Sequence, residues 1–588
     1  MTPSERRVIQ EPDTPAAAPD VRLGTPRATV QARLPDGRIF EAPPGTLLND
    51  FLAAALPRAE TGSVPAVAAI VDGRLRELRT PLQRDAEVTP VLVTDADGAR
   101  IYRRSLAFLL VTAAAEVFPE ADVLIEHSAP TVGGYFCSVR GRAPFSAEDL
   151  RQLDARMRAI VAADEPIEKS VLPISEATQL FYDRGELDKA RLLAHRRRDT
   201  LVLYSLRGRR DYFQGYMVPS TGCLRGFALE WFTAGFLLCF PHQARPLEVA
   251  HVEPYPKLFE VFEEAGEWLD KLGIRNAGSL NDAIQEGRLP EISLVAEALH
   301  EARIAKIASE IVAAGDRIRV VLVAGPSSSG KTTFSKRLAV QLLANGHHPF
   351  PLALDDYFVD RELTPLDEHG DADFEALHAL DVHLFNEHLL SLMSGHTTTL
   401  PRYSFVLGRR EPGQTVTLTR DHVIIVEGIH GLNPALVPEL PHEVVYRVYV
   451  SALTQLNLDR HNRVSTADSR LVRRIVRDAS SRGYNAAETI RRWPSVQRGE
   501  KHHIFPYQEH SDAIFNSSLV HELAVLRSAA EPLLLQVRTH DPEYVEANRL
   551  LSFLQWFRAA PADPVPDNSI LREFIGNSIL ENFRLWTR

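Results

Sequence analysis

The sequence predicts a multidomain α/β protein in which a doubly wound parallel sheet follows two smaller domains. At 588 residues, the chain is too long for a single hydrophobic core. Residues 316–530 alternate apolar strands with amphipathic helices, which is the pattern of a parallel sheet covered on both faces. Residues 28–95 are rich in strand signals, whereas residues 96–245 mix long helices with strands in an α+β pattern.

Composition and charge indicate an ordinary soluble protein. Apolar residues make up 45% of the chain and charged residues 24%, and the formal net charge of −11 argues against coating of bulk nucleic acid. The three cysteines (Cys137, Cys223 and Cys239) form no Cys-x-x-Cys pair, which suits a reducing cytosol. Residues 1–27 predict a disordered tail, not a secretory signal. The apolar stretch 226–240 is too short to span a bilayer, so we expect a cytoplasmic protein without membrane contact.

Residues 28–95 predict a β-grasp (ubiquitin-like) domain. A strand that alternates at period two leads into the turn signal Pro35-Asp36-Gly37 and a second strand. Thr46 is placed to cap a helix. Further strands are expected near 66–71 and 87–93, which completes the order β-β-α-β-β.

The next regions are predicted from their apolar patterns. Residues 96–245 contain an apolar helix over 105–117, two later helices near 146–163 and 175–183, and several strands. Residues 246–315 predict a helical connector, and residues 531–588 predict a helical C-terminal tail.

A phosphate-binding loop begins the doubly wound region. It consists of Gly325, Pro326, Ser327, Ser328, Ser329, Gly330, Lys331 and Thr332, and it is followed by Thr333. A buried strand precedes this P-loop and an amphipathic helix follows it, as the motif requires. Backbone N–H groups at the start of the helix are expected to hold the phosphates. Lys331 would reach the outer phosphates, and the Thr332 hydroxyl would ligate Mg²⁺.

Three further segments distinguish this region from a bare nucleotide site. Asp355 follows a short strand, so its carboxylate is expected at the ligand crevice, where it could take a proton from an attacking hydroxyl. Glu427 ends an apolar strand and is a candidate for holding Mg²⁺. A helix carries Arg473, Arg474 and Arg477, which we expect on a lid that closes over the phosphates.

These segments resemble the phosphoribulokinase/uridine kinase family. The resemblance rests on the P-loop, on Asp355-Asp356-Tyr357-Phe358, on the segments around Glu375 and Tyr403, on Glu427-Gly428-Ile429 and on the arginine helix. It implies that Asp355 is the base and Glu375 holds ribose hydroxyls. It also implies that Tyr403 and Phe405 line the acceptor pocket. A histidine that uridine kinases usually carry after this segment is replaced by residues 407–410, which leaves the acceptor open.

The first two domains resemble the N-terminal part of threonyl-tRNA synthetase. Residues 28–95 look like its TGS domain, and residues 96–245 look like its second additional, editing-type domain. The positions of the family's four editing-site residues are taken by Arg104, Phe108, Phe213 and Met217. None of these side chains supplies the expected acid, base or metal ligand, so we infer that this domain does not edit mischarged tRNA.

The sequence therefore predicts an ATP-dependent, Mg²⁺-requiring kinase whose acceptor is a small, nucleoside-like alcohol. A sugar phosphate or another alcohol remains an alternative acceptor, and the loop does not distinguish ATP from GTP. A second class is a nucleotide-gated, RNA- or ribosome-associated regulator. It is motivated by the basic segments 195–198 and 207–210. RNA binding and homo-oligomer formation are left open.

Overall fold

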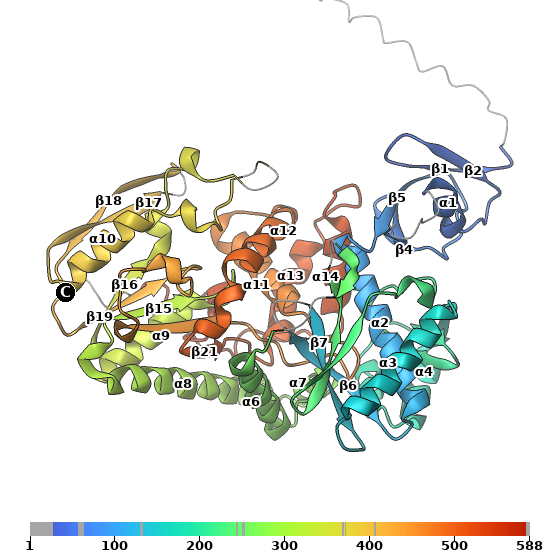
Figure 1. Ribbon diagram of the computed structural model, residues 1–588, viewed down its shortest axis with the longest axis horizontal. Coiled ribbons are helices and arrows are strands. Elements are labelled where there is room, and N and C mark those ends of the chain that lie inside the picture. Colours follow the sequence, from blue (N-terminus) through green and yellow to red (C-terminus); the bar gives the residue numbers. More distant parts are fainter. Residues whose placement is uncertain are drawn as a thin grey trace, which may run out of the picture.

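The computed structural model describes residues 27–56, 64–129, 133–242, 245–249, 253–366, 370, 372–404 and 407–583. These residues form a multidomain, mixed α/β molecule, as the sequence predicts. In Figure 1 the N-terminal sheet and the α+β unit lie at the right, the parallel sheet lies at the left, and α11, α13 and α14 lie between them. The predicted tail lies outside the described residues, apart from Arg27. Among the helices of the described ranges, none combines the length and the apolar character that a bilayer span needs.

The N-terminal unit is a mixed sheet with one helix, in the order expected for a β-grasp domain. Its strand order is β2-β1-β5-β3-β4, with β1 and β5 parallel. Gly37 has a φ of 84° in the predicted turn. The capping prediction is wrong, because Thr46 donates to the Pro43 carbonyl and Leu47 precedes the helix without a side-chain cap. The elements are β1 (Val30–Arg33), β2 (Ile39–Ala42), α1 (Leu48–Ala55), β3 (Ala66–Val71), β4 (Arg74–Glu77) and β5 (Ala86–Leu92).

The α+β unit is built around the buried helix α2 (Ala96–Val117), which starts nine residues before the predicted Ser105. One sheet has the order β11-β12-β7-β6 and a second has the order β10-β9-β8. The remaining elements are β6 (Asp122–Ala129), β7 (Gly134–Arg140), α3 (Ala147–Ala162), β8 (Glu168–Pro173), α4 (Ile174–Asp183), α5 (Leu187–Leu193), β9 (Thr200–Leu206), β10 (Arg209–Asp211), β11 (Ala228–Phe232), β12 (Gly235–Cys239), β13 (Pro241–His242) and β14 (Arg245–Val249).

Three helices connect this unit to the parallel sheet, and each ends or begins at a recognisable signal. Pro256 occupies the first turn of α6, and Gly273 ends it in a left-handed conformation with φ 70°. Asn276 caps α7 by accepting from the Ser279 N–H. The helices are α6 (Pro256–Leu272), α7 (Ala277–Gln285) and α8 (Leu289–Ala313).

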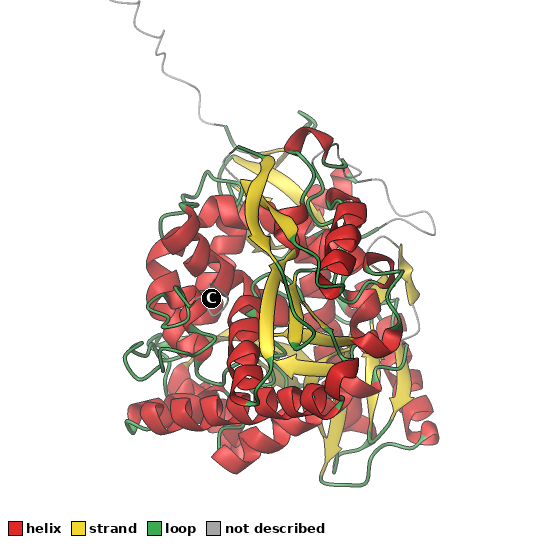
Figure 2. Ribbon diagram, turned by 90° about the vertical axis from the view of Figure 1, so that its left-hand side faces the viewer, coloured by secondary structure: helices red, strands yellow, loops and turns green. Residues whose placement is uncertain are grey.

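The parallel sheet has the order β16-β19-β15-β20-β21, so the P-loop strand β15 lies at its centre. All five residues of β15 are buried, as expected for a strand covered on both faces. Val321 and Val323 pack with Phe334 of α9, whereas Val320 and Leu322 pack with the core around α10. In Figure 2 the helices flank these strands. The sheet is therefore doubly wound, and its carboxyl edge carries the P-loop.

The elements of this C-terminal half follow the alternation seen in the sequence. They are β15 (Val320–Ala324), α9 (Lys331–Ala344), β16 (His348–Ala353), α10 (Val382–Met393), β17 (Thr398–Ser404), β18 (Arg409–Val416), β19 (His422–Glu427), β20 (Val445–Ser451), α11 (Thr466–Arg477), α12 (Ala486–His503), β21 (Ala513–Asn516), α13 (Glu522–Leu534), α14 (Tyr544–Leu554) and α15 (Arg572–Ile575).

Candidate nucleotide and phosphoryl-transfer site

The P-loop runs from the end of β15 to the start of α9. Ser328 and Gly330 take left-handed conformations with φ of 58° and 88°. A Cβ on Gly325 would lie 1.9 Å from the Val450 carbonyl oxygen, so only glycine fits there. The first N–H groups of α9 face the loop without partners from their own helix, which makes this turn an anion site.

Lys331 and Thr332 lie where the loop meets the neighbouring strand β19. The Lys331 ammonium donates to the carbonyl oxygens of Gly325 (2.9 Å) and Pro326 (3.2 Å). Thr332 Oγ1 donates to Glu427 Oε1 over 2.9 Å, and Glu427 is paired with Val323 in the sheet register. The two predicted Mg²⁺ ligands are thus brought together, and their hard oxygen atoms fit that ion.

Three carboxylates with raised pKa values surround Lys331. Loss of solvation raises the pKa of Glu427 to about 7, against the effect of the Lys331 ammonium, and Asp355 raises it further. Glu375 is also raised to a pKa of about 7, first by loss of solvation and then by Glu500. Asp355 is exposed, but the surrounding protein atoms remove part of the solvation of its carboxylate, and this loss raises the pKa of Asp355. The site therefore concentrates acidic groups around Lys331, with Arg474 and Arg482 as further cations that act on Glu375 and Asp355 respectively.

The two aspartates after β16 have different surroundings. Both lie in a 3-10 turn over Leu354–Tyr357. Asp356 accepts a hydrogen bond from the Tyr403 N–H over 3.1 Å and so ties this turn to β17. The charges nearest Asp355 are Lys331 and Arg482, whose positive charges oppose the rise of its pKa. Of the pair, Asp355 therefore faces the P-loop cation.

The predicted acceptor residues gather beside this turn. Tyr403 is buried, and its ring lies 5.6 Å from that of Phe358. Phe374 contacts Phe358 from the other side, with ring centroids 6.1 Å apart. Glu375 packs closely against Gly499 of α12, where an added Cβ would meet Glu375 Cβ at 2.2 Å. The predicted residue Phe405 lies outside the described part of the chain.

Helix α11 departs from the predicted lid. Leu471, Val472 and Ile475 are fully buried in the main core, so the helix is packed in place. Arg473 is 0% exposed and donates to the Ser517 carbonyl (2.8 Å) and to Glu522. Arg473 also donates to the Ser328 carbonyl of the P-loop over 3.4 Å, so its assignment to the phosphates stays a prediction, although its charge is already paired inside the core.

The other arginines of α11 lie closer to the loop. Arg474 Nη1 donates to Ser327 Oγ over 2.7 Å, so its guanidinium group contacts the P-loop. Arg477 contacts Asp478 at 3.2 Å, and burial together with Arg482 lowers its pKa. Arg470, one turn earlier, donates to the Ser327 carbonyl over 3.1 Å. Of the predicted lid arginines, both Arg473 and Arg474 therefore contact the P-loop, and Arg474 does so through the Ser327 side chain.

Sequence reasoning missed two glutamates that bind the loop itself. Glu500 of α12 accepts from the Ser327 N–H over 2.8 Å and forms a buried pair with Arg470. Glu573 of α15 accepts from the Thr333 N–H (3.2 Å) and hydroxyl (2.8 Å). Each carboxylate therefore accepts a hydrogen bond from a backbone N–H group that could otherwise donate to a bound anion. No local signal marks either residue, because both reach the loop only through tertiary contacts.

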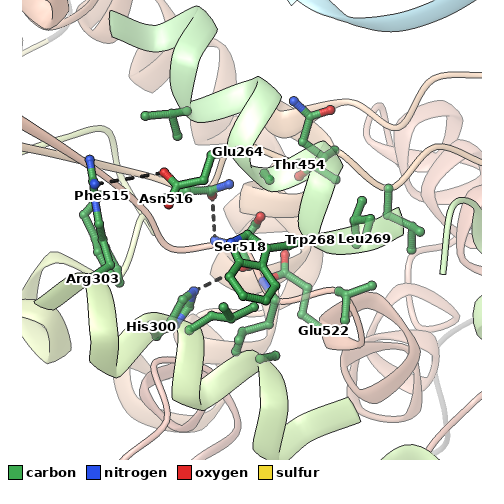
Figure 3. A pocket seen from close by; sticks show the side chains of 18 of the residues that line it. Glu264, Trp268, Leu269, His300, Arg303, Thr454, Phe515, Asn516, Ser518 and Glu522 are labelled. Atoms are coloured by element: carbon green, nitrogen blue, oxygen red, sulfur yellow. Dashed lines mark hydrogen bonds and ion pairs between the residues drawn. The ribbon is translucent and has the colours of Figure 1, made fainter. Parts of the chain in front are cut away.

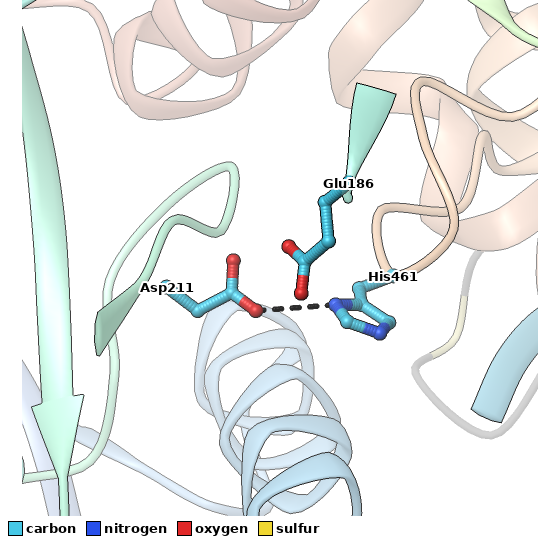
Figure 4. Close-up of side chains that lie close together, drawn as sticks. All are labelled: Glu186, Asp211 and His461. Atoms are coloured by element: carbon cyan, nitrogen blue, oxygen red, sulfur yellow. Dashed lines mark hydrogen bonds and ion pairs between the residues drawn. The ribbon is translucent and has the colours of Figure 1, made fainter. Parts of the chain in front are cut away.

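A second acidic cluster lies away from this cleft, at the contact between α5, β10 and the loop after β20. Ligand atoms of Glu186, Asp211 and His461 lie within 4.8 Å of one another (Figure 4). The Lys189 ammonium contacts all three, at 3.1 Å, 2.5 Å and 2.8 Å respectively. A buried ammonium thus takes the place that a metal ion would need, and the cluster is complete as an ionic network.

A cavity of about 310 Å³ lies between α6, α8 and β21 (Figure 3). Its wall includes Trp268 of α6, His300 and Arg303 of α8, and Phe515 of β21. Among the described residues, none of those predicted for the phosphoryl-transfer site lines it. We therefore assign it no role in the chemistry.

The four positions that correspond to editing residues lie close to one another, and three of them carry apolar side chains. The Phe108 and Phe213 rings are 5.3 Å apart, and Met217 is 3% exposed beside Ser105. Arg104 donates to the Tyr216 carbonyl over 2.6 Å, and burial lowers its pKa to about 10. This arrangement supports the inference that the domain does not hydrolyse mischarged tRNA.

The central P-loop strand, the parallel sheet and the loop–helix turn define a P-loop nucleotide-binding fold. Within it, residues 320–524 match the family described as "Phosphoribulokinase / Uridine kinase family". A structure titled as a possible uridine kinase from Bacillus stearothermophilus is 26% identical, covers 25% of this chain and 79% of that one, and has a TM-score of 0.22. The resemblance of this region to the kinase family is therefore confirmed.

The N-terminal region matches part of threonine–tRNA ligases. The enzyme of Pelobacter propionicus is 33% identical over 206 residues, which cover 34% of this chain and 31% of that protein. That of Burkholderia vietnamiensis is 36% identical over 202 residues, with the same coverages of 34% and 31%. The chain thus spans less than a third of the length of these relatives. The second resemblance is also confirmed.

Proposed function

We propose that this protein is an ATP-dependent phosphotransferase that moves the γ-phosphate to a hydroxyl of a nucleoside or a related sugar. The observation that carries the proposal is the position of Asp355. Its carboxylate lies at the carboxyl edge of the parallel sheet, close enough to Lys331 for the two charges to interact. A nucleotide switch has no need for such a proton acceptor, whereas transfer to an alcohol does.

The P-loop residues supply the phosphate and metal contacts. The N–H groups at the start of α9 and the Lys331 ammonium bind the phosphates, after Lys331 leaves the Gly325 and Pro326 carbonyls. Thr332 and Glu427 would hold Mg²⁺, which neutralises charge on the phosphates when bound. Arg474 approaches the same phosphates from α11.

Asp355 is positioned to accept the proton of the acceptor hydroxyl. Its raised pKa makes it a stronger base than a solvated aspartate, and the nearby Lys331 favours its ionised form. The aromatic residues Phe358, Phe374 and Tyr403 form a wall beside it, which suits the flat base or ring of the acceptor. Glu375 offers oxygen atoms to hydroxyl groups of that acceptor.

The acceptor remains the least specified part of the site. The segment in place of the uridine kinase histidine contains Arg410, which forms an ion pair with Asp381 over 2.9 Å and is thereby partly neutralised. We therefore propose three classes of acceptor, namely a nucleoside, a sugar phosphate or another small alcohol. Each would share the base Asp355 and differ in its contacts with Glu375 and the aromatic wall.

The alternative of an RNA-associated regulator gains no specific support from the basic segments. Arg196 stacks over Trp556 at 3.8 Å from the ring centroid. Arg207 pairs with both Glu116 and Glu165, and Arg209 contacts Glu186 at 3.0 Å. These arginines are thus engaged within the protein, which reduces the charge available to a phosphate backbone.

Substitution of Asp355 tests the proposal, with its neighbour as a matched control. Asp355→Asn should lower the rate of acceptor-dependent ADP release by about 10²–10⁴-fold while MgATP affinity changes little, because only proton transfer is lost. Asp356→Asn should retain most of the turnover, since Asp356 contacts the Tyr403 N–H and serves as a structural link. Turnover of Asp355→Asn close to that of the wild type would remove Asp355 as the base.

A further inference from the structure

The loop between β20 and α11, residues 457–464, is buried against the α+β unit; we refer to it as the docking loop. Asn457, Asp459, His461 and Asn462 are each at most 8% exposed, although they are polar and lie outside any helix or strand. Buried polar groups are retained only where they find partners. The partners of the docking loop therefore show what holds it.

One group of partners comes from three consecutive residues of the editing-like segment. The Tyr212 hydroxyl donates to Asp459, and the Gln214 N–H donates to Asn462 Oδ1 over 3.0 Å. Between them, the Phe213 ring stacks on His461 with centroids 6.4 Å apart and an interplanar angle of 17°. The docking loop thus lies against the segment whose counterpart serves editing in the synthetases.

Charged partners complete the contact. Lys189 is fully buried and joins Asp211 to His461, as described above. Arg460 forms ion pairs with Asp188 (2.8 Å) and Asp122 (2.7 Å). Burial alone would raise the pKa of Asp211, but Lys189 and His461 hold it well below its usual value. Lys189, within the α+β unit, is thus the main partner of Asp211, and His461 of the docking loop adds attraction across the contact.

The backbone fixes the docking loop as well. The Ile125 N–H of β6 donates to the Arg460 carbonyl over 2.9 Å. The Asn457 side chain donates to the carbonyls of Ile125 (3.1 Å) and Glu126 (2.8 Å). These bonds define one position of the loop against β6, whereas charges alone would allow several.

The docking loop is joined directly to the P-loop contacts. It ends at Val464, and Ser465 caps α11 by accepting from the Asp468 N–H. Further along α11, Arg470 and Arg474 contact Ser327. The position of these guanidinium groups over the P-loop therefore depends on where the docking loop is held.

We propose that the α+β unit is an intramolecular clamp whose former editing segment now binds the docking loop and thereby positions α11 over the P-loop. Tyr212, Lys189 and Arg460 are its positioning residues. The clamp rests on the proposed function only in that Arg474 is assigned to the phosphates. It gives the synthetase-like half a role in the kinase half that needs no RNA.

A pair of matched tyrosine substitutions tests the clamp. Tyr212→Phe removes the hydrogen bond to Asp459 of the docking loop, whereas Tyr204→Phe removes a similar buried bond to Glu77 of the N-terminal sheet. In the full-length protein without nucleotide, Tyr212→Phe should speed amide hydrogen exchange in residues 466–477 by about tenfold. Tyr204→Phe should leave exchange in this helix unchanged, even where it lowers the melting temperature.

Nucleotide affinity gives the second readout. Tyr212→Phe should weaken MgATP binding by about fivefold, because the arginines must be ordered on binding. Arg460→Met, which removes two ion pairs between the docking loop and the α+β unit, should weaken MgATP binding similarly. Arg207→Met removes two ion pairs that lie wholly within the α+β unit and should leave MgATP binding unchanged. Equal exchange of residues 466–477 in both tyrosine variants would overturn the clamp. If the wild type binds no nucleotide, the proposed function fails, and the exchange result still decides the inference.

Discussion

At the residue scale, the site is governed by carboxylates that surround a single lysine. Asp355, Glu375 and Glu427 all have raised pKa values, and Lys331 opposes the rise for each of them. Such a cluster is unfavourable without a further cation, because like charges repel in a poorly solvated cleft. A bound divalent ion would relieve this repulsion, which supports the proposal that the site takes Mg²⁺ together with nucleotide.

We predict that Glu427 makes both stability and metal binding depend on pH. Its pKa in the folded protein, about 7, lies above its ordinary value of 4.5, so the folded state binds the extra proton between these values. The free energy of unfolding contributed by Glu427 therefore falls as pH rises through this window, and it is constant above it. The affinity for Mg²⁺-nucleotide should rise over the same window, because only the ionised carboxylate holds the metal.

Titrations of Mg²⁺-nucleotide binding between pH 5.5 and about 8.5 would check this prediction. Glu427→Gln keeps an acceptor for Thr332 but cannot ionise, so its affinity should be lower and flatter with pH. Its melting temperature should exceed that of the wild type most clearly above pH 7. An unchanged pH profile in Glu427→Gln would assign the titration to another group.

At the element scale, α11 combines a structural and a ligand-binding role in adjacent residues. Arg473→Met should destabilise the protein by about 3–5 kcal/mol, because it leaves Glu522 buried without its cation. Arg474→Met should instead preserve the melting temperature and weaken MgATP binding by about tenfold, since its guanidinium contacts Ser327. Thermal melts and nucleotide titrations of the two variants would separate these roles. Equal loss of affinity in both would contradict the division.

The residues of the site show which features could be predicted from the sequence and which could not. The P-loop, Asp355 and Glu427 could be predicted because each lies at or just after the end of a strand, and parallel strands bring their carboxyl ends to one edge. The burial of Arg473 could not, because its partners Ser517 and Glu522 are decided by the packing of β21 and α13. Helical spacing places the four arginines near one another but does not say which of them faces the core.

At the scale of the whole molecule, one apolar cluster extends through both halves, beside other clusters that belong to one half alone. Phe181 and Tyr212 of the α+β unit belong to the same buried cluster as Val321 of the P-loop strand and Trp556 near the C-terminus. This continuity could not be predicted from the sequence, in which the connector residues 246–315 indicate only helices. The physical reason is that α7 packs against α5 of the α+β unit, whereas the adjoining α8 packs against α9 of the P-loop half.

We expect the two halves to unfold in one cooperative transition that MgATP shifts as a whole. A ligand that binds only the folded state raises the free energy of unfolding by an amount set by its concentration relative to Kd. At one hundred times Kd, this increase is about 2.7 kcal/mol. We do not extend this expectation to the small N-terminal sheet, because it has an apolar cluster of its own. Calorimetry of the full chain would check it. Two resolved transitions, of which only the P-loop half responds to MgATP, would show that the halves are independent.

The measurement that tests the central claim most directly is release of ADP from MgATP in the presence of candidate acceptors. The panel should contain nucleosides, sugar phosphates and small alcohols, with GTP as an alternative donor and Asp355→Asn as the inactive control. We predict that one alcohol acceptor stimulates ADP release by the wild type and that Asp355→Asn abolishes this stimulation. Tight MgATP binding without stimulation by any acceptor would contradict phosphoryl transfer to an alcohol and favour a nucleotide-gated protein.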